Sequence, residues 1–209
     1  MKKLSFFFIA LFVFVLLLPA NVLACACCAD SGDYSIQTSK PGSAELEILN
    51  NIKFDKVSEL FMGGEIKGMQ GKGEYPDRII NYSEFKVINT FAAKTWKFNF
   101  NPYDDDELTG TLTLPMPLQM LNFKVDIHDG KMGGGGGPLL YKEWRFKGTV
   151  QSGKGFFQAG IIKPTTYFLV LQGRGNNCDN AEDFTNWILE VNGKQANYRF
   201  FGKLSSGTP

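Results

Sequence analysis

The chain has 209 residues, and its 22 Lys and Arg residues almost balance its 21 Asp and Glu residues. Nucleic-acid binding requires clustered basic side chains that neutralise phosphates, so this near-neutral charge argues against that class of partner. Hydrophobic residues make up 44% of the chain, which argues against a disordered protein. Because there is only one histidine, a metal site built from several histidines is excluded.

The first 24 residues have the pattern of an export signal. Lys2 and Lys3 precede an uncharged stretch, and small residues lie just before Cys25. The apolar stretch is about fifteen residues long, and a membrane-spanning helix needs about twenty. We therefore expect residues 1–24 to be cleaved off, and residues 25–209 to form a single domain with a Cys-rich N-terminal tail, residues 25–28.

The end of this signal has two interpretations. Val22 and Ala24 are small enough for an ordinary signal peptidase. The run Val22-Leu23-Ala24-Cys25 also resembles the lipobox of bacterial lipoproteins, which implies lipidation of Cys25. Either way, the expected location is extracytoplasmic: secreted, periplasmic or lipid-anchored at the cell envelope. The chain would touch a membrane only through its signal or its lipid anchor.

Alternating apolar and polar residues predict strands with one buried face. The pattern occurs in residues 96–100, 108–114, 121–127 and 144–150, and the polar face of 121–127 would carry Lys124 and Asp126 into solvent. Residues 167–171 are apolar without alternation, which predicts a strand covered on both faces. Asn192-Gly193 predicts a type I′ turn between two strands, because both of its central residues need positive φ.

These segments together predict an all-β fold. Strand-like runs recur from Tyr34 to Leu204 with no long helical period between them. The pattern favours a single antiparallel β-sandwich or an up-and-down barrel, a calycin-like barrel included. One or two short helices are expected, around residues 180–184 and near residues 57–61.

The cysteines predict a disulfide. In an exported chain we expect Cys178 to pair with Cys27 or Cys28, and the sequence does not choose between them. Such a bridge would close a loop of about 150 residues and contribute about 5 kcal/mol through loop entropy. The alternative is a thiolate copper or zinc site made by Cys25, Cys27 and Cys28. Their spacing differs from the usual zinc pairs, so we expect no metal and no cofactor.

Five polar residues form a weak candidate site. Asp126 and His128 share one face of their predicted strand, where a carboxylate can tune an imidazole. Acidic residues also follow Cys178, and paired carboxylates suffice for glycoside hydrolysis. The candidate residues are Asp126, His128, Asp179, Glu182 and Asp183.

A run of five glycines lies between two predicted strands and can act as a flexible lid loop. Its residues are Gly133, Gly134, Gly135, Gly136 and Gly137.

The sequence contains no catalytic motif, and we expect a non-enzymatic binding protein more than an enzyme. Its ligand would be a small molecule, a glycan or a protein. The alternatives are a carboxylate-based extracytoplasmic hydrolase of glycan-like substrates, and a copper- or zinc-binding protein. The sequence does not predict the oligomeric state.

Overall fold

The computed structural model describes residues 27–61, 84–92, 94–102, 106–127 and 137–206. The elements, in chain order, are β1 (Tyr34–Ser39), α2 (Ser43–Asn51), β2 (Ile52–Phe61), β3 (Glu84–Phe91), β4 (Thr95–Pro102), β5 (Gly110–Pro115), β6 (Met120–Asp126), β7 (Leu140–Thr149), β8 (Ser152–Gly155), β9 (Thr165–Gly175), η1 (Ala181–Asp183), β10 (Phe184–Gly193) and β11 (Asn197–Ser206). None of the helices in these ranges is long and apolar enough to cross a membrane.

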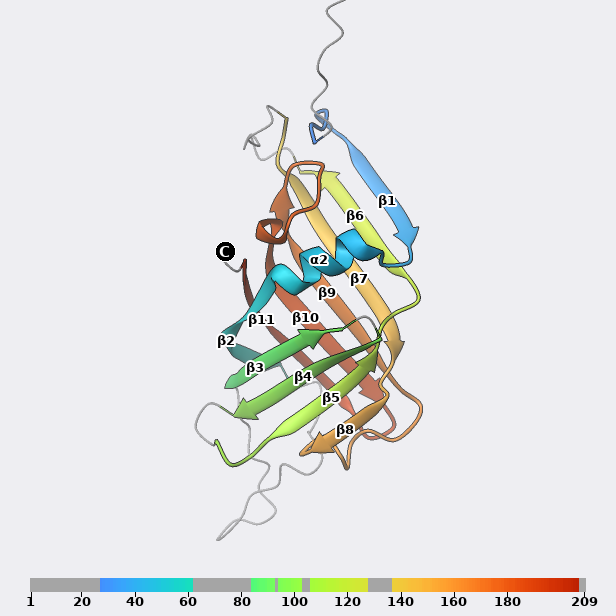
Figure 1. Ribbon diagram of the computed structural model, residues 1–209, viewed down its shortest axis with the longest axis vertical. Coiled ribbons are helices and arrows are strands. Elements are labelled where there is room, and N and C mark those ends of the chain that lie inside the picture. Colours follow the sequence, from blue (N-terminus) through green and yellow to red (C-terminus); the bar gives the residue numbers. More distant parts are fainter. Residues whose placement is uncertain (1–26, 62–83, 93, 103–105, 128–136, 207–209) are drawn as a thin grey trace, which may run out of the picture.

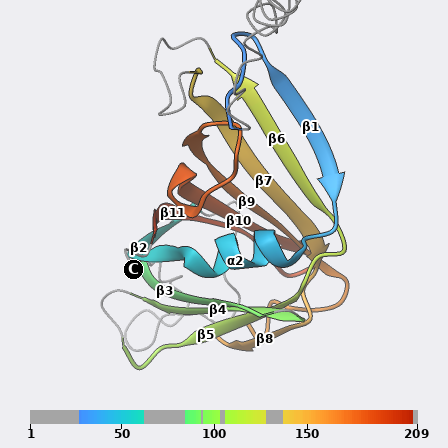
Figure 2. The same cartoon turned by 45° about the horizontal axis from the view of Figure 1, so that its top comes forward.

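The strands confirm the all-β prediction. All strand pairs are antiparallel, in the order β1-β6-β7-β9-β10-β11-β2-β3-β4-β5-β8. The sheet bends at β2 into two facing layers, a larger one of β1, β6, β7, β9, β10 and β11 and a smaller one of β3, β4, β5 and β8 (Figures 1 and 2). Because the pairing order is linear, with β1 and β8 at its ends, the arrangement is a sandwich-like pair of layers.

Aromatic side chains fill the space between the layers. Trp96, Trp144 and Trp187 are fully buried, with Phe85, Phe98, Phe100, Phe146, Phe157, Phe184 and Phe200. Many of the rings meet edge to face, as Trp96 and Phe146 do with centroids 5.0 Å apart. The predicted inward faces of β4, β5 and β7 are confirmed. On the outward face of β9, Val170 is buried, but Phe168 and Gln172 are half-buried and Thr166 is exposed. The prediction that this strand is covered on both faces is therefore wrong.

The predicted helices are half right. The turn expected around residues 180–184 is the 3₁₀ helix η1, but residues 57–61 belong to strand β2, so that prediction is wrong. The α-helix is α2, where Gly42 N donates to Glu45 Oε2 at 2.9 Å and caps the first turn. Leu49 is fully buried, and α2 lies between the two layers at their open end (Figure 2).

The hairpin of β10 and β11 is confirmed, but its predicted turn is wrong. Asn192 pairs with Asn197, and Gly193 N donates to Ala196 O, so the turn centres on residues 194 and 195. Gly193 does not have the positive φ that a type I′ turn requires. A glycine is needed there because a Cβ would lie 2.6 Å from Thr165 Oγ1.

The direction predicted for β6 is wrong along most of the strand. Lys124 and Asp126 are buried on the inner face, whereas Leu121, Phe123 and Val125 lie half-buried on the outer face. At this end of the larger layer the inner face meets the polar loop that precedes η1 instead of the aromatic core. Polar side chains therefore point inward along β6.

Candidate functional site

A disulfide ties the N-terminal segment to the loop between β9 and η1. Cys27 and Cys178 are bonded across a sequence separation of 151 residues, with 4.7 Å between their Cα atoms. This bond selects Cys27 from the two predicted partners, and it removes Cys27 from the set of three thiolates considered for copper or zinc. The backbone strengthens the attachment, because Asn177 N donates to Cys27 O at 2.8 Å.

A second contact holds the segment that follows Cys27. Gly32 has a φ of 84°, a conformation that glycine adopts at no cost, and its N–H donates to Asp126 Oδ2 at 2.8 Å. The buried carboxylate of Asp126 thus accepts a hydrogen bond from the turn that contains Gly32. Gly137, the one described residue of the glycine run, lies against this segment, since a Cβ there would be 2.6 Å from Ala29 O.

Two lysines and two aspartates form a buried ion cluster beneath the disulfide loop. Lys142 is fully buried, and its Nζ lies 2.6 Å from Asp183 Oδ2 and 3.3 Å from Asp179 Oδ1. Lys124 Nζ lies 3.1 Å from the same Asp179 oxygen. Asn122 Nδ2 donates to the other Asp179 oxygen at 2.7 Å. The ammonium groups also donate to the loop backbone, Lys124 to Asn177 O and Lys142 to Cys178 O.

Two glycines of β9 allow η1 to pack this closely. A Cβ at Gly173 would lie 1.7 Å from Asp183 O, and a Cβ at Gly175 would lie 2.1 Å from Asp183 Oδ1. Asp183 also accepts from Asn180 N at 3.1 Å, which closes the turn at the start of η1. The sequence therefore places the carboxylate of Asp183 directly over β9.

The contacts of the cluster are those of a structural ion network. The carboxylates of Asp179 and Asp183 converge, as a two-carboxylate hydrolase needs, but the ammonium group of Lys142 occupies the space between them. Two cations and two anions balance, so no charge in the cluster is left buried without a counter-charge. The arrangement fixes the Cys178 loop and gives no support to the hydrolase alternative.

The outer face of the larger layer has a different character. Tyr34 and Ile36 of β1 are 71% and 58% exposed, and they lie beside Val125 and Phe123 of β6. Phe123 lies under the guanidinium of Arg145, 5.6 Å from its centroid. The outer face of the smaller layer carries mostly Lys, Asn and Thr: Lys97, Asn99, Asn101, Thr111 and Thr113. Ile88, 66% exposed beside Asn99, is an apolar residue on the smaller layer's outer face. Polar groups otherwise predominate there, whereas the larger layer exposes neighbouring apolar side chains.

On the outer face of the larger layer, Tyr141 of β7 lies in a group of polar side chains. The Tyr141 hydroxyl donates to Glu143, which also forms an ion pair with Arg145. Burial and the contact with Glu143 raise the pKa of Tyr141 well above its ordinary range. Gln172 of β9 lies directly beside Glu143 in the sheet register.

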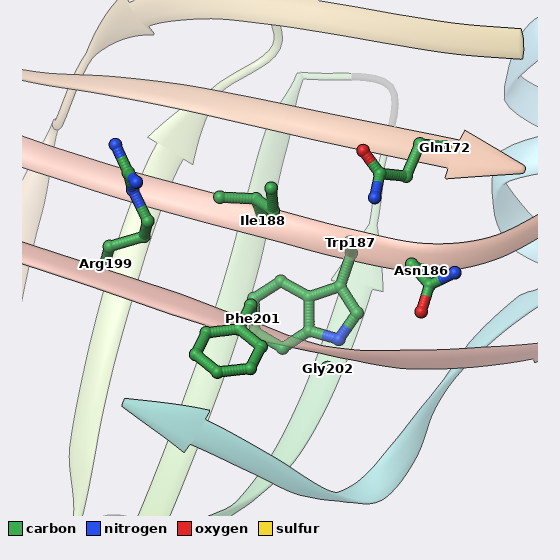
Figure 3. A pocket seen from close by; sticks show the side chains of 7 residues that line it. All are labelled: Gln172, Asn186, Trp187, Ile188, Arg199, Phe201 and Gly202. Atoms are coloured by element: carbon green, nitrogen blue, oxygen red, sulfur yellow. The ribbon is translucent and has the colours of Figure 1, made fainter. Parts of the chain in front are cut away.

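Two open hollows lie next to each other on the outer face of the larger layer. The first has a volume of about 350 Å³ and is lined by Gln172, Asn186, Trp187, Ile188, Arg199, Phe201 and Gly202. Figure 3 shows the side chains of Gln172, Ile188 and Arg199 on three neighbouring strands, β9, β10 and β11. The second, of about 720 Å³, is lined by Lys147, Gly148, Thr149, Thr166, Tyr167, Phe168, Glu190 and Asn192. Arg199 and Glu190 form an ion pair at 2.5 Å, so the border between the hollows is a salt bridge.

Strand irregularities shape the first hollow. The register of β10 against β9 shifts between Phe184 and Asn186, and that of β11 against β2 shifts between Gly202 and Leu204. Bulges bend a strand and increase its twist, and they are common next to binding sites. Asn186 and Gly202, at the two shifts, both line the hollow.

The remaining predicted residues are dispersed or outside the described ranges. Glu182 is exposed and lines a third hollow, between α2 and η1. His128, Cys25 and Gly133–Gly136 lie outside the described residues, so the imidazole site, the lipidation and the lid stay predictions. Among the described residues, no group of three or more His, Cys, Asp or Glu side chains is arranged to hold a metal ion.

Sequence reasoning missed the lysines of the ion cluster and both hollows on the outer face. The sequence did contain one indication of the cluster. Lys142 lies in the same alternation as Leu140, Trp144 and Phe146, which places a lysine at a core-facing position. The hollows join residues of separate strands, so no local pattern reports them.

Comparison with known proteins gives no match to this chain: no family model, no curated protein and no solved structure.

Proposed function

We propose that the chain is exported and acts as a non-enzymatic glycan-binding protein through the outer face of its larger layer. The single observation that carries this proposal is the pair of adjoining hollows on that face, which together extend over β7, β9, β10 and β11. Their combined extent suits an extended chain of sugars better than one small molecule.

The chemistry of the lining supports a sugar ligand. A pyranose ring has apolar faces and polar edges, so its site needs flat or apolar contacts beside hydrogen-bonding groups. Phe201 and Ile188 supply the apolar contacts in the first hollow. The amides of Gln172 and Asn186 and the guanidinium of Arg199 supply donors and acceptors around them.

The filled interior supports a surface site. The buried aromatic side chains pack against one another between the layers, so a ligand of the lipocalin type would have to displace the core. The disulfide supports export, because disulfides persist in oxidising compartments. With the signal-like first 24 residues, it favours the cell envelope or the extracellular space as the place of binding.

The test is a binding assay on the exported protein with its disulfide intact. The protein is titrated with a panel of neutral and acidic polysaccharides from bacterial envelopes and extracellular matrices. We expect at least one to bind. We also expect Phe201→Ala and Asn186→Ala each to weaken that binding about tenfold, which corresponds to about 1.4 kcal/mol.

The matched control is Lys97→Ala, an exposed residue on the outer face of the smaller layer. It should bind as the unmodified protein does. If no polysaccharide binds, or if Lys97→Ala weakens binding as much as Phe201→Ala, the proposal is wrong.

A further inference from the structure

Within the part of the chain that the structure describes, strand β1 ends the sheet, and its outer edge lacks the usual protection. Proteins blunt edge strands with charges, prolines or short length, because an open edge pairs with other strands. The opposite end of the sheet follows that rule: β8 has four residues and includes Lys154. By contrast, β1 has six residues, Tyr-Ser-Ile-Gln-Thr-Ser, with no charge and no proline.

The backbone groups on the open edge can be identified from the pairing with β6. Asp126 N donates to Asp33 O at 2.8 Å, so these two residues form a hydrogen-bonded pair of the antiparallel ladder. Such pairs alternate along the strands. Ser35, Gln37 and Ser39 therefore direct their backbone groups toward β6, and the N–H and C=O groups of the residues between them point to the open side. Those residues are Tyr34, Ile36 and Thr38.

This edge is complementary to itself. When two copies of β1 run antiparallel around a two-fold axis at Ile36, Ile36 pairs with its counterpart, and Tyr34 pairs with Thr38 of the other copy. All three residues then meet in hydrogen-bonded positions. The same register keeps the outer side chains of both copies on one face, so Tyr34 and Ile36, 71% and 58% exposed, lose water contact there.

The charges at the two ends of β1 favour antiparallel pairing with a second copy of the strand. Asp30 and Asp33 lie before the strand and Lys40 lies after it, and all three are exposed. In the antiparallel register Asp33 lies opposite Ser39 of the second copy, one residue from Lys40. Opposite charges then face each other at both ends, within the roughly 8 Å over which surface charges act at physiological salt. A parallel arrangement would bring like charges together.

We propose that two copies of this chain associate through their β1 edges and form one continuous sheet across a two-fold axis. The dimer joins the two larger layers edge to edge, and their outer faces form one surface. This inference rests on β1 and does not depend on what the hollows bind.

The experiment measures the oligomeric state of the exported, disulfide-bonded chain by sedimentation over a wide range of protein concentrations. We expect a reversible monomer–dimer equilibrium. Ile36→Pro removes one N–H of the open edge, and proline is tolerated there because that N–H is not used within the monomer. This variant should stay monomeric at every concentration and keep the near-UV circular dichroism of the unmodified protein.

A charge exchange tests the register. Lys40→Glu and Asp33→Lys should each weaken self-association at least tenfold, because each brings like charges together. Mixed in equal amounts, the two variants should form a heterodimer, since each then supplies the charge that the other needs. Lys97→Glu, a reversal on the smaller layer, serves as the control and should dimerise normally. A monomeric unmodified protein overturns the proposal. So does a dimer that Ile36→Pro leaves intact, or a mixture of the two charge variants that fails to associate.

Discussion

Lys142 Nζ lies 2.6 Å from Asp183 Oδ2, on a core-facing position of β7 where the neighbouring inward residues are Leu140 and Trp144. The pair connects the larger layer to η1, and η1 follows the loop that holds Cys178. The charges and the disulfide therefore stabilise the same loop from two sides.

Removing one partner of the ion cluster should be costly. Lys142→Met keeps the length of the side chain but leaves Asp179 and Asp183 without the cation they share. We expect a loss of about 3–5 kcal/mol in the free energy of unfolding, the range for breaking a buried ion pair. Denaturant unfolding measures it. Lys147→Met, on the exposed face of the same strand, is the control and should change the free energy by less than about 0.5 kcal/mol.

The disulfide should be visible in the mass and in the stability of the exported protein. Intact mass should fall to that of a chain beginning near Cys25, and reduction should add the two hydrogens of one bridge.

Cys178→Ala should lower the free energy of unfolding by up to about 5 kcal/mol, because the unfolded chain without the bridge regains loop entropy. Cys28→Ser should retain the bridge. If Cys28→Ser abolishes the bridge and Cys27→Ser does not, the assignment of Cys27 is wrong.

The reversed direction of β6 predicts unequal costs for two similar substitutions. Phe123 is half-buried on the outer face, whereas Phe146 is fully buried among the core aromatics. Phe146→Ala should cost about 3–5 kcal/mol, as expected for a cavity in a packed core. Phe123→Ala should cost about 1 kcal/mol. Equal costs, measured by denaturant unfolding, would mean that Phe123 points into the core after all.

The sequence predicted the strands better than it predicted their direction. Alternation identified β4, β5 and the part of β7 from Trp144 onward with the correct inward residues, because these residues pack in the aromatic core. In β6 the alternation was equally regular, but the inner face meets the charged loop around Asp179. Which face is buried is decided by a segment more than fifty residues away, and a local pattern carries no information about it.

The same limit explains the candidate site. The acidic residues after Cys178 were identified, and Asp179 and Asp183 do converge, but on lysines that the sequence places on distant strands. The α-helix was missed because its nine residues bury only Leu49 fully, so the apolar period was weak.

Stability should fall in alkaline solution through Tyr167. Burial raises the pKa of its hydroxyl, which donates to Pro115 O at 3.0 Å. The unfolded chain releases this proton from about pH 10, while the folded chain holds it. Above that pH the folded state binds more protons, so the free energy of unfolding decreases as pH rises.

Tyr167→Phe should flatten this alkaline decrease, at a cost of about 1 kcal/mol near neutral pH for the lost hydrogen bond. The measurement is the free energy of unfolding against pH, with Tyr34→Phe as an exposed control. An unchanged alkaline slope in Tyr167→Phe would contradict the assignment.

The most direct test of the proposed binding surface is a lysine-labelling experiment on the unmodified protein, with and without the polysaccharide that binds it. Lys147 lines the second hollow, 5.1 Å from the Phe168 centroid, and Lys97 lies on the outer face of the smaller layer. We expect the ligand to slow the modification of Lys147 several-fold and to leave Lys97 unchanged, as read by peptide mass spectrometry. Protection of Lys97, with Lys147 modified at its original rate, would contradict the proposed location of the glycan.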